Sequence, residues 1–423
     1  MTRFDRVEPR LAELITELAA PSLPDYTDDV LARTAGLRQR PRWTLLERWL
    51  PMGVLAQRSA YIPRVPWRAI IVAALLLVVI AATLAWVGSQ RRAAPPFGPA
   101  RNGLIMYTVD GDLFSWDPAS GTSRPLLEGP TDDFTGIYSR DGTKLAFLRL
   151  ERPPNGDVPE LISIQVANAD GTNPVDVTGP LDAPDQWDWS PAGDAVAVQS
   201  KIDGRPTLQV VPTDGSDGLH IVDTGMAVTW PSWLPPKGDE IVFRGVVETP
   251  DGVRSGLFAV SPDGGEPRPL TATDGDRDDG YGEPIPSPDG THVLYREWDP
   301  VAQMMTLHLL DLRTGTDEAL PRTGAQFGEG GGVFSPDGSL VAFRGHEEAG
   351  YRLYIVPADG SSKPRPFTGI TPGGSYAEFA PDGTKVMLNR FGSGTLLIDV
   401  ESGAAETLPD KISDPATWQR LAP

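Results

Sequence analysis

The chain has 423 residues, of which 57 are acidic, 37 are basic and none is cysteine. The absence of cysteine excludes disulfide bonds, thiolate catalysis and metal sites that need a cysteine ligand. Residues 69–423 carry 26 basic and 49 acidic side chains, a formal charge of −23, which argues against nucleic acid or anionic lipid as a partner of this part.

The first 68 residues contain apolar side chains at helical spacing, in runs that end at prolines. The apolar residues that we assign to a possible protein interface are Leu11, Leu14, Leu18, Trp43 and Trp49. A segment of this size can hardly bury these side chains by itself. Two interpretations follow: a helical anchor on the inner membrane surface, or a docking module for a cytoplasmic protein.

An uncharged apolar stretch, Ala69–Val87, follows this segment. At 1.5 Å per residue it spans roughly 30 Å, the thickness of a bilayer core, so we predict one transmembrane helix over 69–88. Eight arginines between 33 and 68 precede it and three follow it closely. This asymmetry predicts a cell-membrane protein with a cytoplasmic N-terminus. A proline-rich tether, 89–100, then leads to an extracytoplasmic domain, 101–423.

A turn motif close to Ser-Pro-Asp-Gly recurs along residues 101–423 at steps of about 45 to 52 residues, the length of one four-stranded propeller blade. Its six copies end at Gly142, Gly193, Gly238, Gly290, Gly338 and Gly383. Proline presets the backbone of such a turn, aspartate bonds to nearby backbone, and glycine closes it. We therefore expect the aspartates of the motif, Asp141, Asp289, Asp337 and Asp382, to be structural.

Two further columns of residues keep step with the turn. A large side chain stands just before it, and an apolar run such as Leu145–Phe147 follows it. The large residues are Tyr138, Trp189, Trp233, Phe334 and Phe379, with Pro286 as the exception. This aromatic column predicts packing between adjacent blades, and the unbroken apolar runs predict strands buried on both faces.

The two ends of residues 101–423 complement each other. Ile105–Tyr107 and Leu113–Trp116 match the second and third strands of a blade, but no first strand precedes them. Ala416–Trp418 match a first strand alone, with Trp418 in the aromatic column. We therefore predict an all-β, seven-bladed β-propeller closed by its N- and C-terminal strands, which leaves no open edge. The alternative is six blades with loose end segments.

This repeat resembles the WD40-like PD40 repeat of the TolB-type propellers, which also occurs in the propeller domains of prolyl-oligopeptidase-type peptidases. The resemblance covers about residues 101–423 and rests on the turn motif with its apolar strand. It implies a propeller fold and, as in TolB, contacts between proteins of the bacterial envelope. The layout of inner helices, one span and an outer sensor domain is similar to that of bacterial anti-sigma factors, although the HxxxCxxC zinc motif of many of them is missing. That similarity implies a cytoplasmic sigma factor as a partner.

Motifs that carry chemistry are scarce in this sequence. There is no GxSxG nucleophile elbow. The four histidines, His220, His292, His308 and His346, lack the close spacing of a metal motif. Gly328–Gly332 has the composition of a phosphate cradle, but neither a lysine nor a helix start follows, so we expect a loop of a blade.

One acidic loop is a weak candidate for a metal site. The loop contains Asp274, Asp276, Asp278, Asp279 and Glu283, and its alternating carboxylates are similar to those of a calcium loop. The glycine and the closing glutamate of an EF-hand are not at the required distances, however, so a solvated loop is the favoured interpretation.

These observations together predict a single-pass membrane protein with a non-enzymatic propeller that binds or senses a protein or ligand, needs no cofactor and signals through its cytoplasmic helices. The alternative is a propeller hydrolase or lyase with its active site at the mouth of the channel. Histidines and carboxylates that converge there with shifted pKa values would favour the enzyme.

Overall fold

The computed structural model describes residues 75–76, 97–151, 161–182, 184, 186–216, 219–250, 252–272, 281–370, 373–374, 376–390, 394–409, 412 and 416–422. The predicted interface residues between Leu11 and Trp49 and the acidic loop from Asp274 to Asp279 lie outside these residues. Of the predicted span, only residues 75–76 are described, and they are helical. Within the described part of the chain, no helix is long and apolar enough to cross a bilayer.

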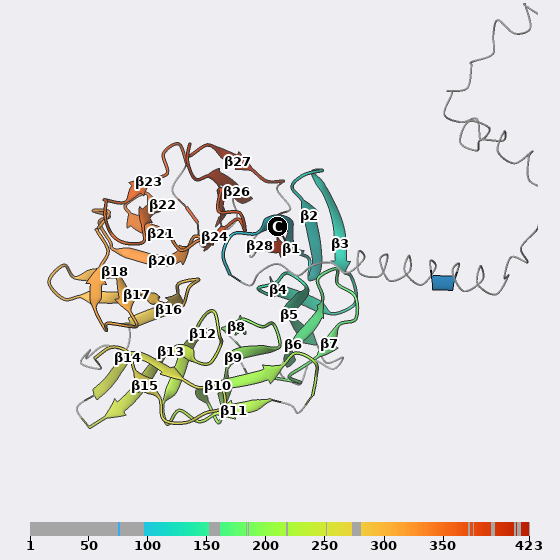
Figure 1. Ribbon diagram of the computed structural model, residues 1–423, viewed down its shortest axis with the longest axis horizontal. Helices are drawn as coiled ribbons and strands as arrows, with labels where there is room; N and C mark the ends of the chain where they lie inside the picture. Colours follow the sequence, from blue (N-terminus) through green and yellow to red (C-terminus); the bar gives the residue numbers. More distant parts are fainter. Residues whose placement is uncertain are drawn as a thin grey trace, which may run out of the picture. The chain divides into compact units, whose positions relative to one another are not determined.

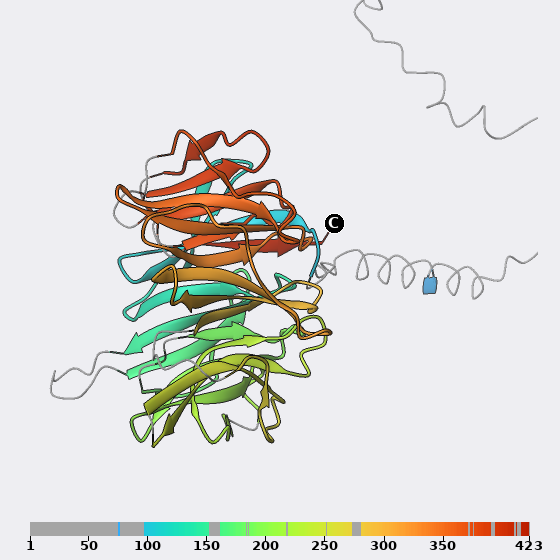
Figure 2. The ribbon, with the colours of Figure 1, turned by 90° about the vertical axis from the view of Figure 1, so that its left-hand side faces the viewer.

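Residues 101–422 form seven four-stranded antiparallel sheets around a central axis, which confirms the predicted seven-bladed propeller (Figure 1). Each repeat supplies its strands from the innermost outward, and consecutive strands are joined by turns at the two faces of the disc (Figure 2).

The blades are numbered from the first complete repeat. Blade 1 contains β4 (Asp132–Tyr138), β5 (Lys144–Glu151), β6 (Leu161–Asn168) and β7 (Val175–Asp176), and blade 2 contains β8 (Trp187–Trp189), β9 (Ala195–Ile202), β10 (Arg205–Pro212) and β11 (His220–Val222). Blade 3 contains β12 (Ala227–Trp233), β13 (Ile241–Thr249), β14 (Gly252–Val260) and β15 (Arg268–Pro269), and blade 4 contains β16 (Tyr281–Pro286), β17 (His292–Asp299), β18 (Met304–Asp311) and β19 (Asp317–Ala319). Blade 5 contains β20 (Glu329–Phe334), β21 (Leu340–Glu347), β22 (Gly350–Pro357) and β23 (Arg365–Pro366), and blade 6 contains β24 (Tyr376–Phe379), β25 (Lys385–Arg390), β26 (Gly394–Asp399) and β27 (Ala405–Thr407). Blade 7 contains β28 (Thr417–Leu421), β1 (Arg101–Val109), β2 (Asp112–Asp117) and β3 (Thr122–Leu127).

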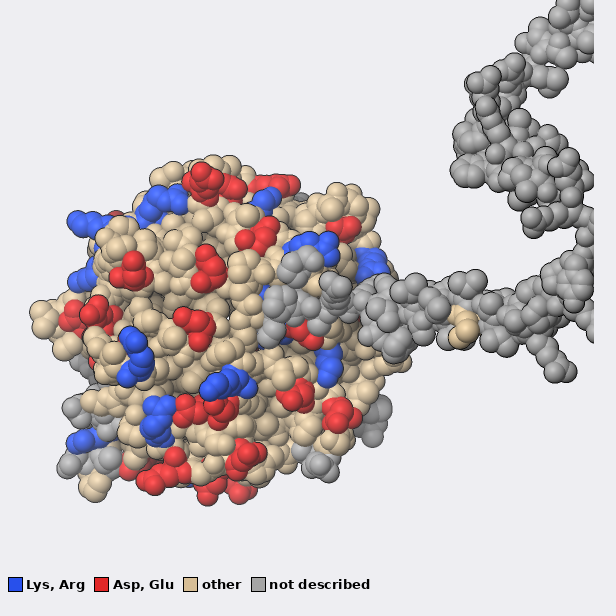
Figure 3. Space-filling model, in the orientation of Figure 1, with Lys and Arg blue, Asp and Glu red and all other residues tan. Residues whose placement is uncertain are grey.

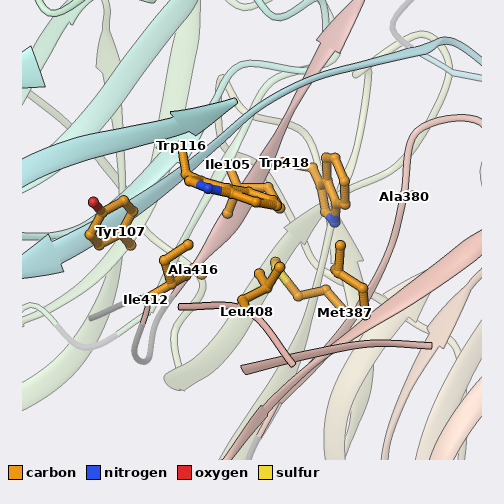
Figure 4. Close-up of a cluster of buried hydrophobic side chains, with 10 residues drawn as sticks. Ile105, Tyr107, Trp116, Ala380, Met387, Leu408, Ile412, Ala416 and Trp418 are labelled. Atoms are coloured by element: carbon orange, nitrogen blue, oxygen red, sulfur yellow. The ribbon is translucent and has the colours of Figure 1, made fainter. Parts of the chain in front are cut away.

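Blade 7 is assembled from both ends of residues 101–422, and it closes the ring. Its innermost strand β28 pairs with β1, so that Ile105 lies opposite Trp418 and Met106 opposite Thr417. The Trp418 side chain packs in a buried cluster that joins blade 7 to Met387 of blade 6 (Figure 4). The six-bladed alternative is therefore wrong.

The contacts between blades follow the predicted columns. Trp189 is almost fully buried among side chains of blades 1 and 2, and its indole Nε1–H donates to the carbonyl oxygen of Ile137 at 3.0 Å. The turn motif also has its predicted role: the Asp337 carboxylate accepts hydrogen bonds from the hydroxyl of Ser335 and the backbone N–H of Ser339. The other three aspartates of the motif make the same kind of bond to the threonine two residues further on.

One expectation about the blades is wrong. The glycine-rich stretch Gly328–Gly332 is not a loop, because Glu329–Phe334 is the innermost strand β20 of blade 5. Hydrogen bonding to β21 holds this strand in place, and the low intrinsic strand preference of glycine is overridden by the sheet around it. The stretch therefore forms part of the wall of the channel.

Candidate functional site

A cavity of about 590 Å³ opens at the end of the channel where the Ser-Pro-Asp-Gly turns lie. We call it the mouth cavity; Ser139, Pro288, Pro336 and Pro381 of the turns border it, and residues of all seven innermost strands line its wall. Its volume falls within the range of about 300–1,000 Å³ that is typical of ligand pockets. Elsewhere, acidic and basic side chains are interspersed over the face in view (Figure 3).

Two positions of the repeat contribute to the wall in nearly every blade. Alternate residues of a strand point the same way, and the residues one and three places before the aromatic column face the cavity. The residues one place before are Ile137, Asp188, Ser232, Ile285, Val333, Glu378 and Thr417. The residues three places before are Thr135, Gln186, Trp230, Glu283, Gly331 and Tyr376. Among the residues one place before the aromatic column, only Asp188 and Glu378 are carboxylates, and the others are apolar or small.

Arg140 and Asp188 form an ion pair across blades 1 and 2. Arg140 stands where most copies of the turn have proline, and its Nη2 lies 3.0 Å from Oδ1 of Asp188. The other carboxylate oxygen, Oδ2, accepts from the Ser232 hydroxyl at 3.1 Å and from the Trp233 backbone N–H at 3.0 Å. Asp188 thus connects three successive blades and fixes the position of Arg140.

Glu378 of blade 6 and Arg420 of blade 7 are two further titratable side chains that line the cavity near Arg140. Burial raises the pKa of Glu378 to about 8, because the ionised form loses its hydration; the Trp418 backbone N–H, 3.3 Å from Oε1, and the two arginines oppose this rise only in part. Burial, together with the positive charge of Arg140, lowers the pKa of Arg420 to about 10. At neutral pH, Glu378 is therefore mostly protonated and Arg420 remains a cation.

Left-handed backbone occurs at the same place in four innermost strands. Thr135, Trp230, Glu283 and Gly331 have positive φ values of 50°, 57°, 41° and 46°. The pairing with the second strand of each blade shifts there, as in a β-bulge. Bulges often lie beside functional sites, where they redirect a side chain. Here all four lie on the wall of the mouth cavity.

The end of the tether also borders the mouth cavity. The guanidinium of Arg140 lies 5.6 Å from the centre of the Phe97 ring, and Nη2 of Arg420 donates to the carbonyl oxygen of Gly98. The backbone N–H of Ala100 donates to the carbonyl oxygen of Pro381 at 2.8 Å. Arg140 and Arg420 therefore also contact Phe97 and Gly98 at the end of the tether.

None of the four histidines lines the mouth cavity. His220 lies on β11, His292 at the start of β17, His308 on β18 and His346 on β21. Of the cavity's carboxylates, sequence analysis singled out only Glu283, as part of the acidic loop; Asp188 and Glu378 were not singled out, nor were Arg140 and Arg420. Their signal is a break in the repeat: arginine takes the proline position in blades 1 and 7, and a carboxylate precedes the aromatic column in the flanking blades 2 and 6.

No protein-family model matches the chain, and no curated protein matches it. Solved structures do share its fold. An oligogalacturonate lyase from Vibrio parahaemolyticus is 14% identical with a TM-score of 0.54, and the match covers 74% of this chain and 91% of the lyase. A puromycin hydrolase is 17% identical with a TM-score of 0.53, over 77% of this chain and 55% of the hydrolase. TolB from Acinetobacter baumannii is 18% identical with a TM-score of 0.47, over 74% of this chain and 81% of TolB.

The similarities to the lyase and the hydrolase show the propeller fold and no activity, because the identities are low. The chain spans about half the length of the puromycin hydrolase. Evidence on function must therefore come from the mouth cavity itself.

Proposed function

We propose that this chain is a membrane-tethered binding protein, and that its propeller holds the carboxylate group of a ligand in the mouth cavity without transforming it. The observation that carries the proposal is the group formed by Arg140, Arg420, Asp188 and Glu378. With Glu378 protonated, these four side chains have a net charge of +1 at pH 7, in a domain whose overall charge is strongly negative. A cation of this kind, inside an acidic protein, favours an anionic group.

The remaining wall suits an apolar ligand body beside that anionic group. Phe97, Trp187, Trp230 and Tyr376 line the cavity, and the Tyr376 side chain is half exposed to it. A guanidinium and a carboxylate make short, strong, charge-assisted hydrogen bonds. A protonated Glu378 adds an O–H donor that an ionised glutamate lacks.

The alternative enzyme has one supporting observation, the raised pKa of Glu378, because such shifts are frequent in catalytic acids and bases. Nucleophilic or two-carboxylate catalysis also needs a second group beside the first. The Asp188 carboxylate already accepts bonds from Arg140, Ser232 and Trp233. This arrangement supports binding more than chemistry.

A binding experiment with the full-length chain tests the proposal. The probes are a mixed tripeptide library with free carboxyl termini and the same library with amidated termini, and tryptophan fluorescence reports binding because Trp187, Trp230 and Trp418 line the cavity. We expect only the free-carboxyl library to change the fluorescence. Arg420→Gln should weaken that binding by about tenfold or more, since a hydrogen bond to a charged group contributes about 1.5–3 kcal/mol.

The control variant is Arg313→Gln, whose side chain is 85% exposed on the turn between β18 and β19; it should bind as the wild type does. Equal binding of both libraries, or none, would rule out a carboxylate site. Mass spectrometry of the bound library distinguishes a binding protein from an enzyme. A product that forms with the wild type and not with Glu378→Gln would show that the chain is an enzyme.

The proposal places the propeller outside the cell and residues 1–68 inside, on the arginine asymmetry of the sequence. Because Phe97 contacts Arg140 and Gly98 contacts Arg420, a ligand that occupies these arginines would also alter the end of the tether. This shared contact is a route for a signal to the membrane. Protease added to intact cells should remove the propeller and spare the N-terminus, and the reverse pattern would overturn the orientation.

The cytoplasmic helices are proposed to receive that signal by docking a protein, for which a sigma factor is the expected candidate. Trp43 and Trp49 supply the type of anchor that dominates many interfaces. Changing both to alanine should abolish co-purification of the cytoplasmic partner and leave the chain in the membrane fraction. If crosslinked wild-type cells yield no partner, these helices are membrane anchors instead.

A further inference from the structure

Three side chains of the metal-binding type converge on blade 4, away from the mouth cavity. They are Glu297 of β17, His308 of β18 and Asp317 of β19, and their ligand atoms all lie within 4.8 Å of one another. Nδ1 of His308 is 3.2 Å from Oδ1 of Asp317 and 3.5 Å from Oε2 of Glu297. One imidazole nitrogen therefore faces two carboxylate oxygens.

The register of blade 4 places all three residues on one face of the sheet. His308 lies opposite Tyr295 in the pair of β17 with β18, and Glu297 is two residues further along β17. Asp317 lies opposite Leu310, two residues beyond His308, in the pair of β18 with β19. Because residues two apart in a strand point the same way, the side chains meet on the same side of the blade.

The buried Tyr295 side chain contacts both His308 and Asp317 and holds them in position. Its side chain is only 1% exposed, and its ring centre lies 5.5 Å from that of the His308 imidazole. The phenolic O–H donates to Oδ2 of Asp317, so that Oδ1 is directed at His308. A hydrogen bond to the oxygen that is not a ligand is the usual way in which proteins orient a metal-binding carboxylate.

We propose that Glu297, His308 and Asp317 bind a divalent cation of the zinc type. Ligand atoms at about 2.0–2.2 Å from a tetrahedral zinc ion lie about 3.3 Å from one another, which agrees with the separations of 3.2 and 3.5 Å at His308. The ion takes the place of the proton that Nδ1 shares with the carboxylates. An imidazole ligand favours zinc over calcium or magnesium, which prefer oxygen.

The three side chains are only partly covered, with 19% exposure for His308, 32% for Glu297 and 35% for Asp317. Solvent can therefore supply the fourth ligand of the ion. The site would also join three successive strands of blade 4, including β19, a strand of three residues whose side chains are all exposed. Its main effect is then to stabilise the outer part of this blade.

The experiment uses the full-length chain after treatment with EDTA and dialysis, with Zn²⁺ alone as the probe. Titration calorimetry should show one equivalent of zinc bound. His308→Gln should lower the affinity by more than about a hundredfold, and Tyr295→Phe, which removes only the orienting O–H, by about tenfold. Saturating zinc should raise the Tm of the wild type by on the order of 3 °C and leave that of His308→Gln unchanged.

The matched control is His220→Gln, because His220 is an exposed histidine on the outermost strand β11 of another blade; it should bind zinc as the wild type does. A chain this acidic also attracts divalent ions without a defined site, so calcium at equal concentration serves as a competitor. Zinc binding that survives His308→Gln, that calcium displaces, or that is absent altogether would overturn the proposal.

Discussion

At the interfaces between blades a large side chain recurs in every repeat but that of blade 4, which has Pro286, whereas at the mouth cavity the repeat is interrupted more widely. Trp189 and Trp418 occupy equivalent positions in different blades, and both are buried against the preceding blade. The four charged residues of the proposed binding site occupy positions that hold proline, or a small or apolar residue, in blades 3, 4 and 5. Arginine replaces proline in the turn of blade 1, and glutamate replaces a small or apolar residue in blade 6.

The comparison of the blade interfaces with the mouth cavity separates two kinds of residue. The interface residues are needed for the fold, whereas the charged residues of the mouth are not. A proline turn and an uncharged residue one place before the aromatic column would build the propeller in blades 1 and 6 as they do in blades 3, 4 and 5. The four departures from the repeat come from successive blades around the ring: Glu378 from blade 6, Arg420 from blade 7, Arg140 from blade 1 and Asp188 from blade 2. They therefore lie together on one side of the mouth cavity. A partly buried glutamate with a raised pKa tends to destabilise the fold at neutral pH, so packing alone does not account for it, and the proposed binding role would.

The largest loss of stability is expected from changes to β28, the strand that completes blade 7 and closes the ring. Deleting residues 412–423 removes β28 and exposes the edge of β1 at Ile105, so cooperative unfolding should be lost. Trp418→Ala alone should reduce the free energy of unfolding by about 3–5 kcal/mol. Val301→Ala, at a side chain that is 92% exposed, should change it by less than about 0.5 kcal/mol. Chemical denaturation measures all three, and identical curves for wild type and deletion would mean that β28 does not close the ring.

The blade interfaces could be predicted from sequence because they repeat. The aromatic column and the apolar runs were visible at a constant spacing, and Ala416–Trp418 could be matched to the missing first strand of Ile105–Tyr107. The strand Glu329–Phe334 was missed because glycines carry no alternation of apolar and polar side chains. Only its pairing with β21 makes it a strand.

The two sites were harder to predict, for different reasons. Arg140 and Glu378 are visible as departures from the repeat, but their meeting depends on which blades are neighbours across the closed ring. The positive φ at Trp230 and Glu283 comes from the ladder shift and has no mark in the sequence. The group at His308 depends on the register of three strands, in which a shift of one residue would turn Asp317 to the other face.

A smaller loss of stability is expected from a substitution at Gly142, in the turn of blade 1 that contacts blade 7. Its φ is 70°, and an added Cβ would lie 1.8 Å from the carbonyl oxygen of Arg420 in blade 7. Gly142→Ala should therefore lower the free energy of unfolding by about 3 kcal/mol, from backbone strain and displacement of the neighbouring turn. Gly121→Ala is the matched control: φ is 67° there but no atom lies within 4 Å, so only the strain of about 1 kcal/mol remains. Equal losses would mean that the contact between blades 1 and 7 is unimportant.

The smallest change in the free energy of unfolding is expected from Glu378→Gln, which removes the ionisable group and keeps the shape of the side chain. The pKa of Glu378 is about 8 in the folded chain and about 4.3 in an unfolded one. Between these values the folded state binds more protons, so the stability of the wild type should fall as pH rises from about 4.3 to about 8 and then level off. The glutamine variant cannot ionise and should lack this part of the slope.

Above pH 8 the variant should be more stable than the wild type by on the order of 1 kcal/mol, since water in the cavity screens much of the charge. Glu318→Gln, on the exposed outer strand β19, should follow the wild-type pH curve. The measurement is urea denaturation at intervals between pH 4 and pH 9. Parallel curves for wild type and Glu378→Gln would show that Glu378 is ionised at neutral pH like a surface carboxylate, and the mouth would then lose the positive charge on which carboxylate binding depends.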